Sequence, residues 1–451
     1  MEGSKTMKRF TLLFFLFIVT FTLPSHSFAE NSLQQMVDSL KDGEVLKLEN
    51  KTYQGNITID KPIELIGQKN TIIEGDRTGN VISVRSPNVS IKNVTVTNSS
   101  FNRNSSEEYA AIKIYEDQTF IDNVTIKHSY HGIYLSQSHH NTIQNSHITG
   151  MGKDQIANQG NGLHVYYSNN NVFKNNVIEG TRDGMFFDYA NDNQILNNRI
   201  SETRYGLHYM YSDRNDFRDN TFTFNTGGAA IMNSNGIQLM NNQFIFNYGH
   251  KSFGLLLLSA RDTVIEENTF FLNQRGLYID QSTNSSIRKN KVIKNQIGIE
   301  LWASSNEQVF SLNEIDENTI PVATLGGEGR NSWSENQKGN NWGGAFPVLD
   351  LNEDGIGDQP VQYQSSLYEL IEDQELTYLF LKSPAIAVYE KMNQFLNKEK
   401  KMFEDPYPIV KKGGAHLGSL GYVAAGIILI LILLKGRQWL CITFGRNGRK
   451  T

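Results

Sequence analysis

The chain has 451 residues, 39% of them hydrophobic and 20% charged, so it has enough apolar material for a sizeable core. Glycine is frequent (37 residues) and proline is scarce (9), a mixture typical of many short strands and turns rather than of a helical bundle or a disordered chain. The net charge of −5 and the lack of a long basic run argue against a nucleic-acid-binding protein. The single cysteine, Cys441, excludes a disulfide scaffold and a thiolate zinc site.

The N-terminus has the features of an export signal. Basic residues including Lys8 and Arg9 precede the apolar run Phe10–Leu23, and small side chains stand three and one positions before a cleavage point after Ala29. The apolar run is short for a bilayer span, which argues against a transmembrane start helix. We therefore expect residues 1–29 to be a signal peptide and the rest of the chain to be exported.

A repeat with a 22-residue spacing dominates residues 30–330. In the six repeats that start at Gly162 to Gly276, the glycine is followed 11 and 16 positions later by apolar residues and 14 positions later by an asparagine. The hydrophobic period within a repeat is two rather than 3.6, which indicates short strands. Three short strands with turns in one repeat predict one coil of a parallel β-helix. The glycines include Gly162, Gly184, Gly206, Gly228, Gly254, Gly276 and Gly298, and the asparagines are Asn176, Asn198, Asn220, Asn242, Asn268 and Asn290.

The predicted fold is all-β, a single-stranded right-handed parallel β-helix of about 13 coils. The amphipathic stretch Leu33–Leu40 is expected to cap its N-terminal end. We expect the repeated glycine to supply a turn φ angle that other residues avoid. We expect the asparagines to stack and to hydrogen-bond along their column, where they would satisfy buried backbone groups of the turns.

Side-chain alternation predicts which residues face outward. The first and third residues after the glycine are apolar in nearly every coil and should point inward, so the second and fourth should face outward. These outward positions carry aromatic, histidine and methionine side chains, which favours a binding face. Cover by a loop or by the C-terminal segment is the alternative. The expected binding face includes Tyr166, Phe186, Asp188 and Tyr211.

Part of the outward face has the ligand types of a copper site. His208 and Met210 are two residues apart on one strand, about 6.6 Å between Cα atoms, and Met232 is expected about 4.8 Å from Met210 on the next coil. Thioether and imidazole donors suit Cu(I), whereas Mg²⁺ and Ca²⁺ prefer oxygen. His164 lies two coils earlier and is a candidate for a second site. Ordinary packing of these side chains is the alternative. The histidines between positions 128 and 147 could also bind metal, and a solvated loop is the alternative for them.

Carbohydrate chemistry is the other function that this face suggests. Long β-helices present aromatic residues and carboxylates to polysaccharides, and inverting glycosidases use two separated acids. Asp280 and Glu300 are expected about 8 Å apart on adjacent coils, within that range. Asp188 stands four coils from Asp280, and the outward columns contain no cluster of three acids with a flanking Lys or Arg. Catalysis is therefore the weaker of the two hypotheses.

A segment with acidic residues follows the coils, within residues 331–414. After the sequence N-N-W-G-G, the run D-L-N-E-D-G-I-G-D has oxygen ligands at positions 1, 3, 5 and 9 of a calcium loop. Val361 replaces the bidentate acid at position 12, which excludes a complete EF-hand. A weaker calcium site and a plain loop of Asx turns both remain open. The candidate ligands are Asp350, Asn352, Asp354 and Asp358.

The C-terminal part has the features of a membrane anchor. Residues 366–398 have the pattern of one or two helices, and the run Leu417–Leu434 is uncharged and mostly apolar. Such a run just crosses a hydrocarbon core of about 30 Å. Basic residues follow it, so residues 415–435 are expected to span the membrane with a cytoplasmic tail at 436–451. The bulk of the protein would then lie at the extracytoplasmic face of the cytoplasmic membrane.

Two coils resemble a known family. The run Y-G-L-H-Y-M-Y-S at residues 205–212, followed one coil later by G-A-A-I-M-N-S, is similar to the MYS-bearing coils of the NosD family, accessory proteins of nitrous oxide reductase. The N-W-G and D-x-N-x-D-G-I-G-D elements also resemble that family, and the resemblance covers about residues 44–410. The second MYS reads M-N-S here, with Asn233 in place of Tyr, and the C-terminal anchor departs from the soluble periplasmic form.

The resemblance implies a non-enzymatic function in denitrification. It implies a copper-handling protein that works with an ABC-type ATPase and permease in assembling the copper–sulfur centre of the nitrous oxide reductase apoprotein. It is also compatible with a copper-donating chaperone as a further partner. On this view Met210 and Met232 handle copper with His208 nearby, in agreement with the register.

Overall fold

The computed structural model describes residues 32–151, 156–249, 251–326, 329–367, 370, 374, 377, 380–381, 383–396 and 398–410. The expected signal peptide, membrane anchor and cytoplasmic tail lie outside these residues. Within the described ranges, no helix is long and apolar enough to cross a membrane. The chain divides into two compact units, an N-terminal unit of residues 1–177 and a C-terminal unit of residues 178–451.

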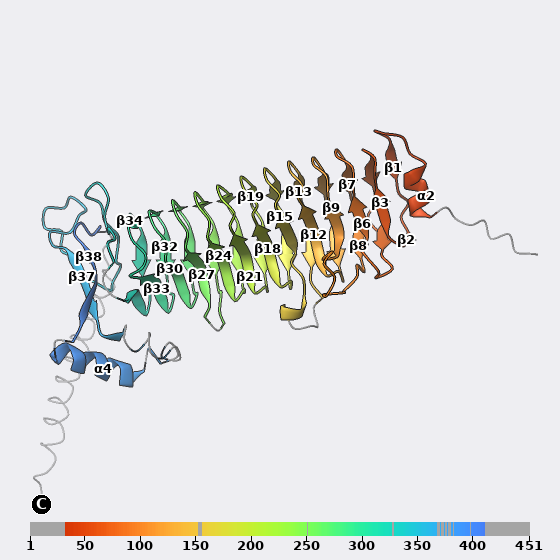
Figure 1. The fold of residues 1–451 in the computed structure, drawn as a ribbon. Coiled ribbons are helices and arrows are strands. Elements are labelled where there is room, and N and C mark those ends of the chain that lie inside the picture. Colours follow the sequence, from red (N-terminus) through yellow and green to blue (C-terminus); the bar gives the residue numbers. More distant parts are fainter. Residues whose placement is uncertain are drawn as a thin grey trace, which may run out of the picture. The chain divides into compact units, whose positions relative to one another are not determined.

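The N-terminal unit begins with helix α2 (Leu33–Asp38) and continues as parallel strands in three sheets, with the 3₁₀ helix η1 (Ile156–Asn158) in one connection (Figure 1). The first sheet contains β1 (Val45–Lys47), β4 (Glu64–Ile66), β7 (Ser90–Lys92), β10 (Phe120–Asp122), β13 (Thr142–Gln144) and β16 (Val172–Lys174). The second contains β2 (Thr52–Gln54), β5 (Ile72–Glu74), β8 (Thr95–Thr97), β11 (Thr125–Lys127), β14 (His147–Thr149) and β17 (Val177–Glu179). The third contains β3 (Ile57–Ile59), β6 (Ile82–Val84), β9 (Ala110–Ile114), β12 (His131–Ser136) and β15 (Leu163–Tyr166).

The C-terminal unit repeats the same three parallel sheets. The first sheet contains β19 (Gln194–Leu196), β22 (Asp216–Arg218), β25 (Gln238–Met240), β28 (Val264–Glu266), β31 (Ser286–Arg288) and β34 (Val309–Ser311). The second contains β20 (Arg199–Ser201), β23 (Thr221–Thr223), β26 (Gln243–Ile245), β29 (Thr269–Phe271), β32 (Lys291–Ile293) and β35 (Glu314–Asp316). The third contains β18 (Asp183–Asp188), β21 (Tyr205–Met210), β24 (Gly227–Met232), β27 (Phe253–Leu258), β30 (Arg275–Asp280), β33 (Ile297–Trp302) and β36 (Ile320–Leu325).

The prediction of an all-β parallel β-helix is confirmed, in the form of a solenoid of the right-handed type. The 36 strands β1–β36, three to a turn, make about 12 turns, so the expected 13 coils was an overestimate. Dividing the repeat region by 22 residues overcounts, because two connections are much longer than a turn. They run from Thr97 to Ala110 and from Thr149 to Leu163.

The core lies between the three sheets of each unit. The first and third residues after each repeat glycine are fully buried, as predicted, because alternate side chains of each third-sheet strand point inward. Phenylalanines stack within this core, with 5.1 Å between the ring centroids of Phe222 and Phe244 and 4.9 Å between those of Phe244 and Phe270. Each coil therefore contributes apolar surface that only its neighbours cover.

The repeat glycines are required for a different reason from the one predicted. Among the described residues none of them has a positive φ, so they do not supply an unusual turn angle. A Cβ at Gly206 would lie 2.6 Å from the carbonyl oxygen of Gly228 on the next coil and 2.7 Å from Cδ1 of Phe222. The constraint is therefore the close approach of neighbouring coils. Positive φ angles occur instead at non-glycine residues in the turns, such as Asn197, Tyr211 and Phe224.

We expect Gly206→Ala to destabilise the protein by about 1–3 kcal/mol, the usual range for overpacking, because the Cβ meets backbone that cannot move away. Gly344→Ala is the matched control, since nothing lies within 4 Å of a Cβ at that position. Thermal unfolding of both variants measures the difference, and an equal melting temperature would contradict the steric explanation.

The expected asparagine column forms an asparagine ladder in the C-terminal unit. Each side-chain Nδ2 donates to the Oδ1 of the next asparagine over 2.8–3.1 Å, and each Oδ1 also accepts a backbone N–H. The ladder therefore satisfies turn backbone that is buried from water. Its members are Asn198, Asn220, Asn242, Asn268, Asn290, Asn313 and Asn340. A second column, which the sequence reasoning missed, contains Asn225, Asn247, Asn273, Asn295 and Asn318.

We expect Asn242→Ala to lower the free energy of unfolding by about 2–4 kcal/mol, because several buried hydrogen bonds of roughly 1 kcal/mol each are lost together. The neighbouring exposed Gln243→Ala is the control. Denaturant unfolding followed by circular dichroism compares them, and equal midpoints would show that the ladder contributes little.

Both ends of the solenoid are covered. The predicted N-terminal cap is present as α2, with Leu33 and Val37 buried and the Gln34 side chain hydrogen-bonded to both backbone groups of Thr58 in β3. In the C-terminal unit, Trp342 stacks on Phe403 at 4.1 Å. The antiparallel strands β37 (Val361–Ser365) and β38 (Lys400–Asp405) follow the solenoid. The stretch 366–398, where the sequence predicts one or two helices, contains α4 (Pro384–Phe395).

Candidate functional site

The outer face of the third sheet in the C-terminal unit has two columns of side chains in register. One column is made by the second residues after the repeat glycines and includes Phe186, His208, Ala230, Leu256, Tyr278 and Glu300. The other is made by the fourth residues and includes Asp188, Met210, Met232, Leu258 and Asp280. Met210 of β21 and Met232 of β24 are direct register partners. His208 lies two residues from Met210 on the same face of β21.

His208 is held by a buried carboxylate that the sequence reasoning did not single out. Its Nδ1 lies 3.0 Å from Oδ2 of Asp183 in β18. Arg204 binds the same carboxylate through two hydrogen bonds, of 2.8 Å from Nε and 2.6 Å from Nη2. Burial acts to raise the pKa of Asp183, but the hydrogen bonds from His208 and Arg204 outweigh it and hold that pKa below its usual value.

The contacts of His208 favour one tautomer. Its Nδ1 lies 3.0 Å from Oδ2 of Asp183 and 3.4 Å from Nη2 of Arg204, and the shorter contact is the one to the carboxylate. An ionised Asp183 can only accept hydrogen bonds, so in this contact Nδ1 of His208 donates. In the neutral imidazole the lone pair is then on Nε2. A histidine whose second nitrogen donates to a carboxylate is the usual arrangement of metal ligands, because the carboxylate orients the ring and increases its basicity.

The surroundings of Met232 and of the His208 ring are largely apolar. Met232 and Leu258 pack against a cluster formed by Ala230, Phe253 and Leu256. The ring of Phe186 lies 4.9 Å and that of Tyr205 lies 5.2 Å from the His208 ring. Met210 and Met232 are themselves half-buried. His208, Met210 and Met232 therefore present soft donor atoms at the edge of a low-polarity patch.

The second-residue column is more covered than a free outer face would be. His208 is only 9% exposed and Leu256 only 7%, because side chains at the starts of the strands contact and cover them. Asp183, Tyr205 and Phe253 are such residues. The parallel register that pairs Asp183 with Tyr205 could have revealed this cover, since it places the acid beside the strand that carries the histidine.

His164 lies in the N-terminal unit, in a cluster with Glu108 and His131. Their potential ligand atoms are within 4.8 Å of one another, and His164 also stacks on Tyr134 at 4.3 Å. Burial lowers the pKa of His164 well below its usual value, with further lowering from His131 and Lys113, so the ring is neutral.

The tautomer of His131 is opposite to that of His208. The backbone N–H of Asn161 donates to its Nδ1 over 2.9 Å, so the proton of the neutral ring is on Nε2. A metal at Nε2 would have to displace this proton, and Lys113 adds positive charge nearby. The donor chemistry therefore favours His208 over this cluster as a copper ligand.

The remaining residues of the expected binding face lie in both units. Tyr166 ends β15 of the N-terminal unit and contacts Tyr167 edge-on at 4.7 Å. In the C-terminal unit Phe186 is the register partner of His208, and Asp188 is that of Met210. Tyr211 follows Met210, is 45% exposed, and stacks on Tyr189 at 5.0 Å.

Glu300 is engaged in a way that argues against glycan cleavage. Its carboxylate pairs with Arg275 over 2.7 Å, and their side chains are 2% and 5% exposed. Asp280 accepts a hydrogen bond from Ser304 over 2.8 Å. A carboxylate buried against an arginine is poorly placed to reach a substrate or to hold a proton as a general acid.

The acidic segment after the coils forms a loop of short-range hydrogen bonds. Asp350 accepts the backbone N–H groups of Asp354 and Gly355, and Asp358 accepts that of Leu351. Asn352 donates from its side chain to Asp354. These hydrogen bonds are typical of an Asx-turn loop. They do not test calcium binding, which stays a prediction.

Comparisons with known proteins agree with the resemblance that the MYS-bearing coil suggested. Residues 149–346 match the sequence profile of a family described as "Periplasmic copper-binding protein (NosD)". The match includes the coils that carry His208, Met210 and Met232. This part of the chain is therefore similar to the NosD family.

A NosD relative agrees with this similarity over a shorter stretch. The Pseudomonas aeruginosa protein named "Probable ABC transporter binding protein NosD" is 26% identical over 134 residues, which is 29% of this chain and 31% of that protein. The chain thus spans about a third of that relative's length.

Solved structures are similar in fold to this chain. PfbA, a surface adhesin of Streptococcus pneumoniae, has a TM-score of 0.50 at 15% identity, covering 71% of this chain and 90% of the adhesin. The periplasmic alginate epimerase AlgG has a TM-score of 0.46 at 16% identity, covering 68% of this chain and 83% of the epimerase. At 15% identity the likeness to the adhesin concerns the fold alone and carries no activity across.

We expect Asp183→Asn to destabilise the protein at pH 7 by roughly 1–3 kcal/mol, because a half-buried arginine and a buried histidine lose their anionic partner. The folded-state pKa of Asp183 is lowered, so this stabilisation is fully present above the ordinary value of 3.8 and is lost as the pH falls through the lower folded value. Denaturant unfolding at neutral and acidic pH should show the gap between wild type and variant closing. A gap that stays constant would mean that Asp183 is not ionised in the folded protein.

Proposed function

We propose that this chain is a non-catalytic copper-handling protein that acts outside the cytoplasm and binds Cu(I) at His208, Met210 and Met232. The observation that carries the proposal is the contact between Nδ1 of His208 and Asp183, which favours the tautomer whose Nε2 lone pair lies on the same sheet face as two methionines in register. The NosD-family match over the same coils supports it, since that family is described as periplasmic and copper-binding.

The donor set suits copper in its reduced state. Two thioethers and one neutral imidazole are soft ligands that favour Cu(I) over Ca²⁺ or Mg²⁺. The adjacent apolar cluster would keep water from the metal. Methionine in place of cysteine also suits an exported protein, because exposed thiols oxidise there. Copper would be cargo, bound for transfer. His164 with His131 stays a candidate for a second position.

The partners in this proposal follow from the family. We infer that the protein works with an ABC-type permease and ATPase, as the name of the Pseudomonas aeruginosa relative suggests for that protein. We further propose the nitrous oxide reductase apoprotein as the recipient of the copper, in the assembly of its copper–sulfur centre, and a copper-donating chaperone as its source. A C-terminal membrane anchor at residues 415–435 would keep the protein beside its transporter.

Anaerobic Cu(I) titration of the full chain in detergent tests the proposed ligands. We expect the double variant Met210→Ala/Met232→Ala, and separately His208→Ala, to bind Cu(I) at least tenfold more weakly, since loss of a direct ligand should exceed the 10–100-fold effect typical of its supporting residues. Met240→Ala is the control, because this methionine lies in β25 of the first sheet. A wild type without Cu(I) affinity, or variants that match it, would overturn the proposal.

The positioning function of Asp183 gives an independent test. We expect Asp183→Asn to weaken Cu(I) binding by about 10–100-fold, because the amide no longer favours this tautomer of His208. Circular dichroism at the titration pH checks that the variant is folded. Unchanged affinity in a folded variant would show that His208 does not bind the metal through Nε2.

A further inference from the structure

Helix α4 has an unusual distribution of polar and apolar side chains. The side of the helix that faces the protein includes polar residues, with Asn393 buried and donating from Nδ2 to Ser366 over 3.1 Å, as well as the half-buried Ile386 and Tyr389. Glu390 accepts from the Ser365 side chain of β37 over 3.2 Å. A surface helix of a globular protein normally packs its apolar side against the core. In α4 the inward side is mixed, and much of the apolar surface faces outward instead.

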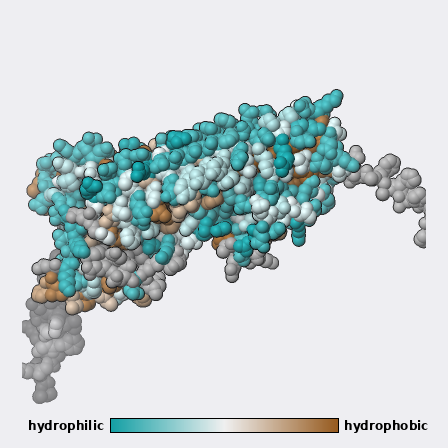
Figure 2. Space-filling view, viewed as in Figure 1, coloured by the Kyte–Doolittle hydropathy of each residue, from teal (hydrophilic) through white to brown (hydrophobic). Residues whose placement is uncertain are grey.

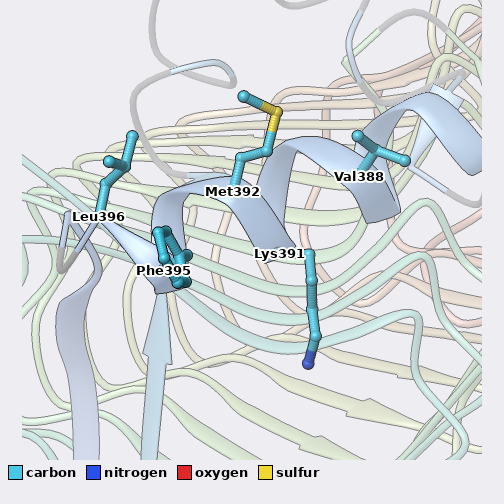
Figure 3. Close-up of a pocket in the computed structure, with 5 residues that line it drawn as sticks. All are labelled: Val388, Lys391, Met392, Phe395 and Leu396. Atoms are coloured by element: carbon cyan, nitrogen blue, oxygen red, sulfur yellow. The ribbon is translucent and has the colours of Figure 1, made fainter.

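The apolar side of α4 is exposed. Val388, Met392, Phe395 and Leu396 follow one another at helical spacing and are 59%, 60%, 87% and 54% exposed. In Figure 3, Val388, Met392 and Leu396 project to one side, Phe395 lies at the end of the helix, and Lys391 points away from them. Figure 2 shows hydrophobic residues gathered over α4, whereas the surface over the coils is mostly hydrophilic. We call these four apolar residues the α4 patch.

The charges around the patch suit an anionic lipid surface. Between residues 388 and 405 the chain has four lysines, at 391, 398, 400 and 401, and four acids, at 390, 399, 404 and 405. Of these acids, Asp405 is buried, Glu390 is bonded to Ser365 of β37, and Glu404 pairs with Lys401 over 3.3 Å. Lys391 bonds to Gln394 over 3.2 Å and keeps its charge at the edge of the patch. An exposed apolar stripe with lysines beside it is the pattern of helices that lie in the interface of a membrane.

The chain that follows places a membrane within reach. Only six residues, 411–416, separate Val410 from the uncharged apolar run Leu417–Leu434. Six residues span at most about 20 Å, so an anchor in this run would hold the end of the described chain close to the bilayer. The two lysines between Val410 and this run, Lys411 and Lys412, add further positive charge.

We propose that α4 is an interfacial membrane helix, whose patch inserts into the headgroup region of an anionic bilayer while its opposite side, which carries Glu390, stays on strand β37. It would add a second membrane contact to the expected anchor and fix the orientation of the C-terminal unit. This inference is independent of copper binding, because it uses none of the residues of the proposed copper site.

Spin-label accessibility in vesicles tests this inference. The full chain with Cys441→Ser and a nitroxide label at Met392→Cys is reconstituted in phosphatidylcholine vesicles that contain phosphatidylglycerol. We expect the label to be open to oxygen and several-fold less accessible to a water-soluble nickel chelate than a label at Gln238→Cys, an exposed position on β25. The second variant Val388→Glu/Phe395→Glu should restore chelate access at Met392→Cys while the melting temperature is unchanged, because both side chains are exposed.

Each other result would overturn the inference. A label open to both reagents would mean that the patch stays in water. A label closed to both would mean that protein covers it, whether a partner subunit or another part of this chain. Cu(I) affinity measured on the same variants should equal that of the wild type, so that loss of membrane contact and failure of the copper proposal are distinguishable.

Discussion

The hydrogen bonds between successive asparagine side chains are the interaction on which the rest of this structure depends. A coil of 22 residues has three turns whose backbone groups are buried by the neighbouring coils, and each needs a partner there. An asparagine at a fixed position supplies an acceptor for the backbone of one coil and a donor to the next. The same stacking requires glycine at the repeat position, because a Cβ there would collide with a backbone carbonyl of the next coil.

This constraint is also what positions the candidate site. Because every coil is held in register with its neighbours, residues 22 apart in the sequence become direct partners on the sheet. Met210 and Met232 meet for that reason alone. The acid that orients His208 comes from the preceding coil, and it reaches the imidazole because β18 and β21 start at equivalent residues. A shift of one residue would turn all of these side chains into the core.

The sequence predicts the fold well because the repeat is visible in it. The glycine and asparagine spacings give the coil, and the alternation of apolar residues gives the inward and outward sides. The function of the glycine was wrongly predicted, since composition cannot distinguish a required φ angle from a required close approach. The coil number was too high because two long connections break the spacing. The coupling of Asp183 and Arg204 to His208 depends on side-chain directions at strand starts, where simple alternation fails. The difference between the tautomers of His131 and His208 depends on single hydrogen bonds, which no spacing encodes.

The contacts of Asp405 have a mechanical consequence. This buried residue of β38 accepts the backbone N–H of Asn340 and the indole N–H of Trp342, at 2.7 and 2.9 Å, and Asn340 is the last member of the asparagine ladder. A pull on the chain beyond Val410 would therefore be carried by Asp405 into the end of the ladder, and from there coil by coil through its amides. If the C-terminus is a tether, the stack of asparagines transmits the force along the protein, and the coil nearest the tether should be the first to detach.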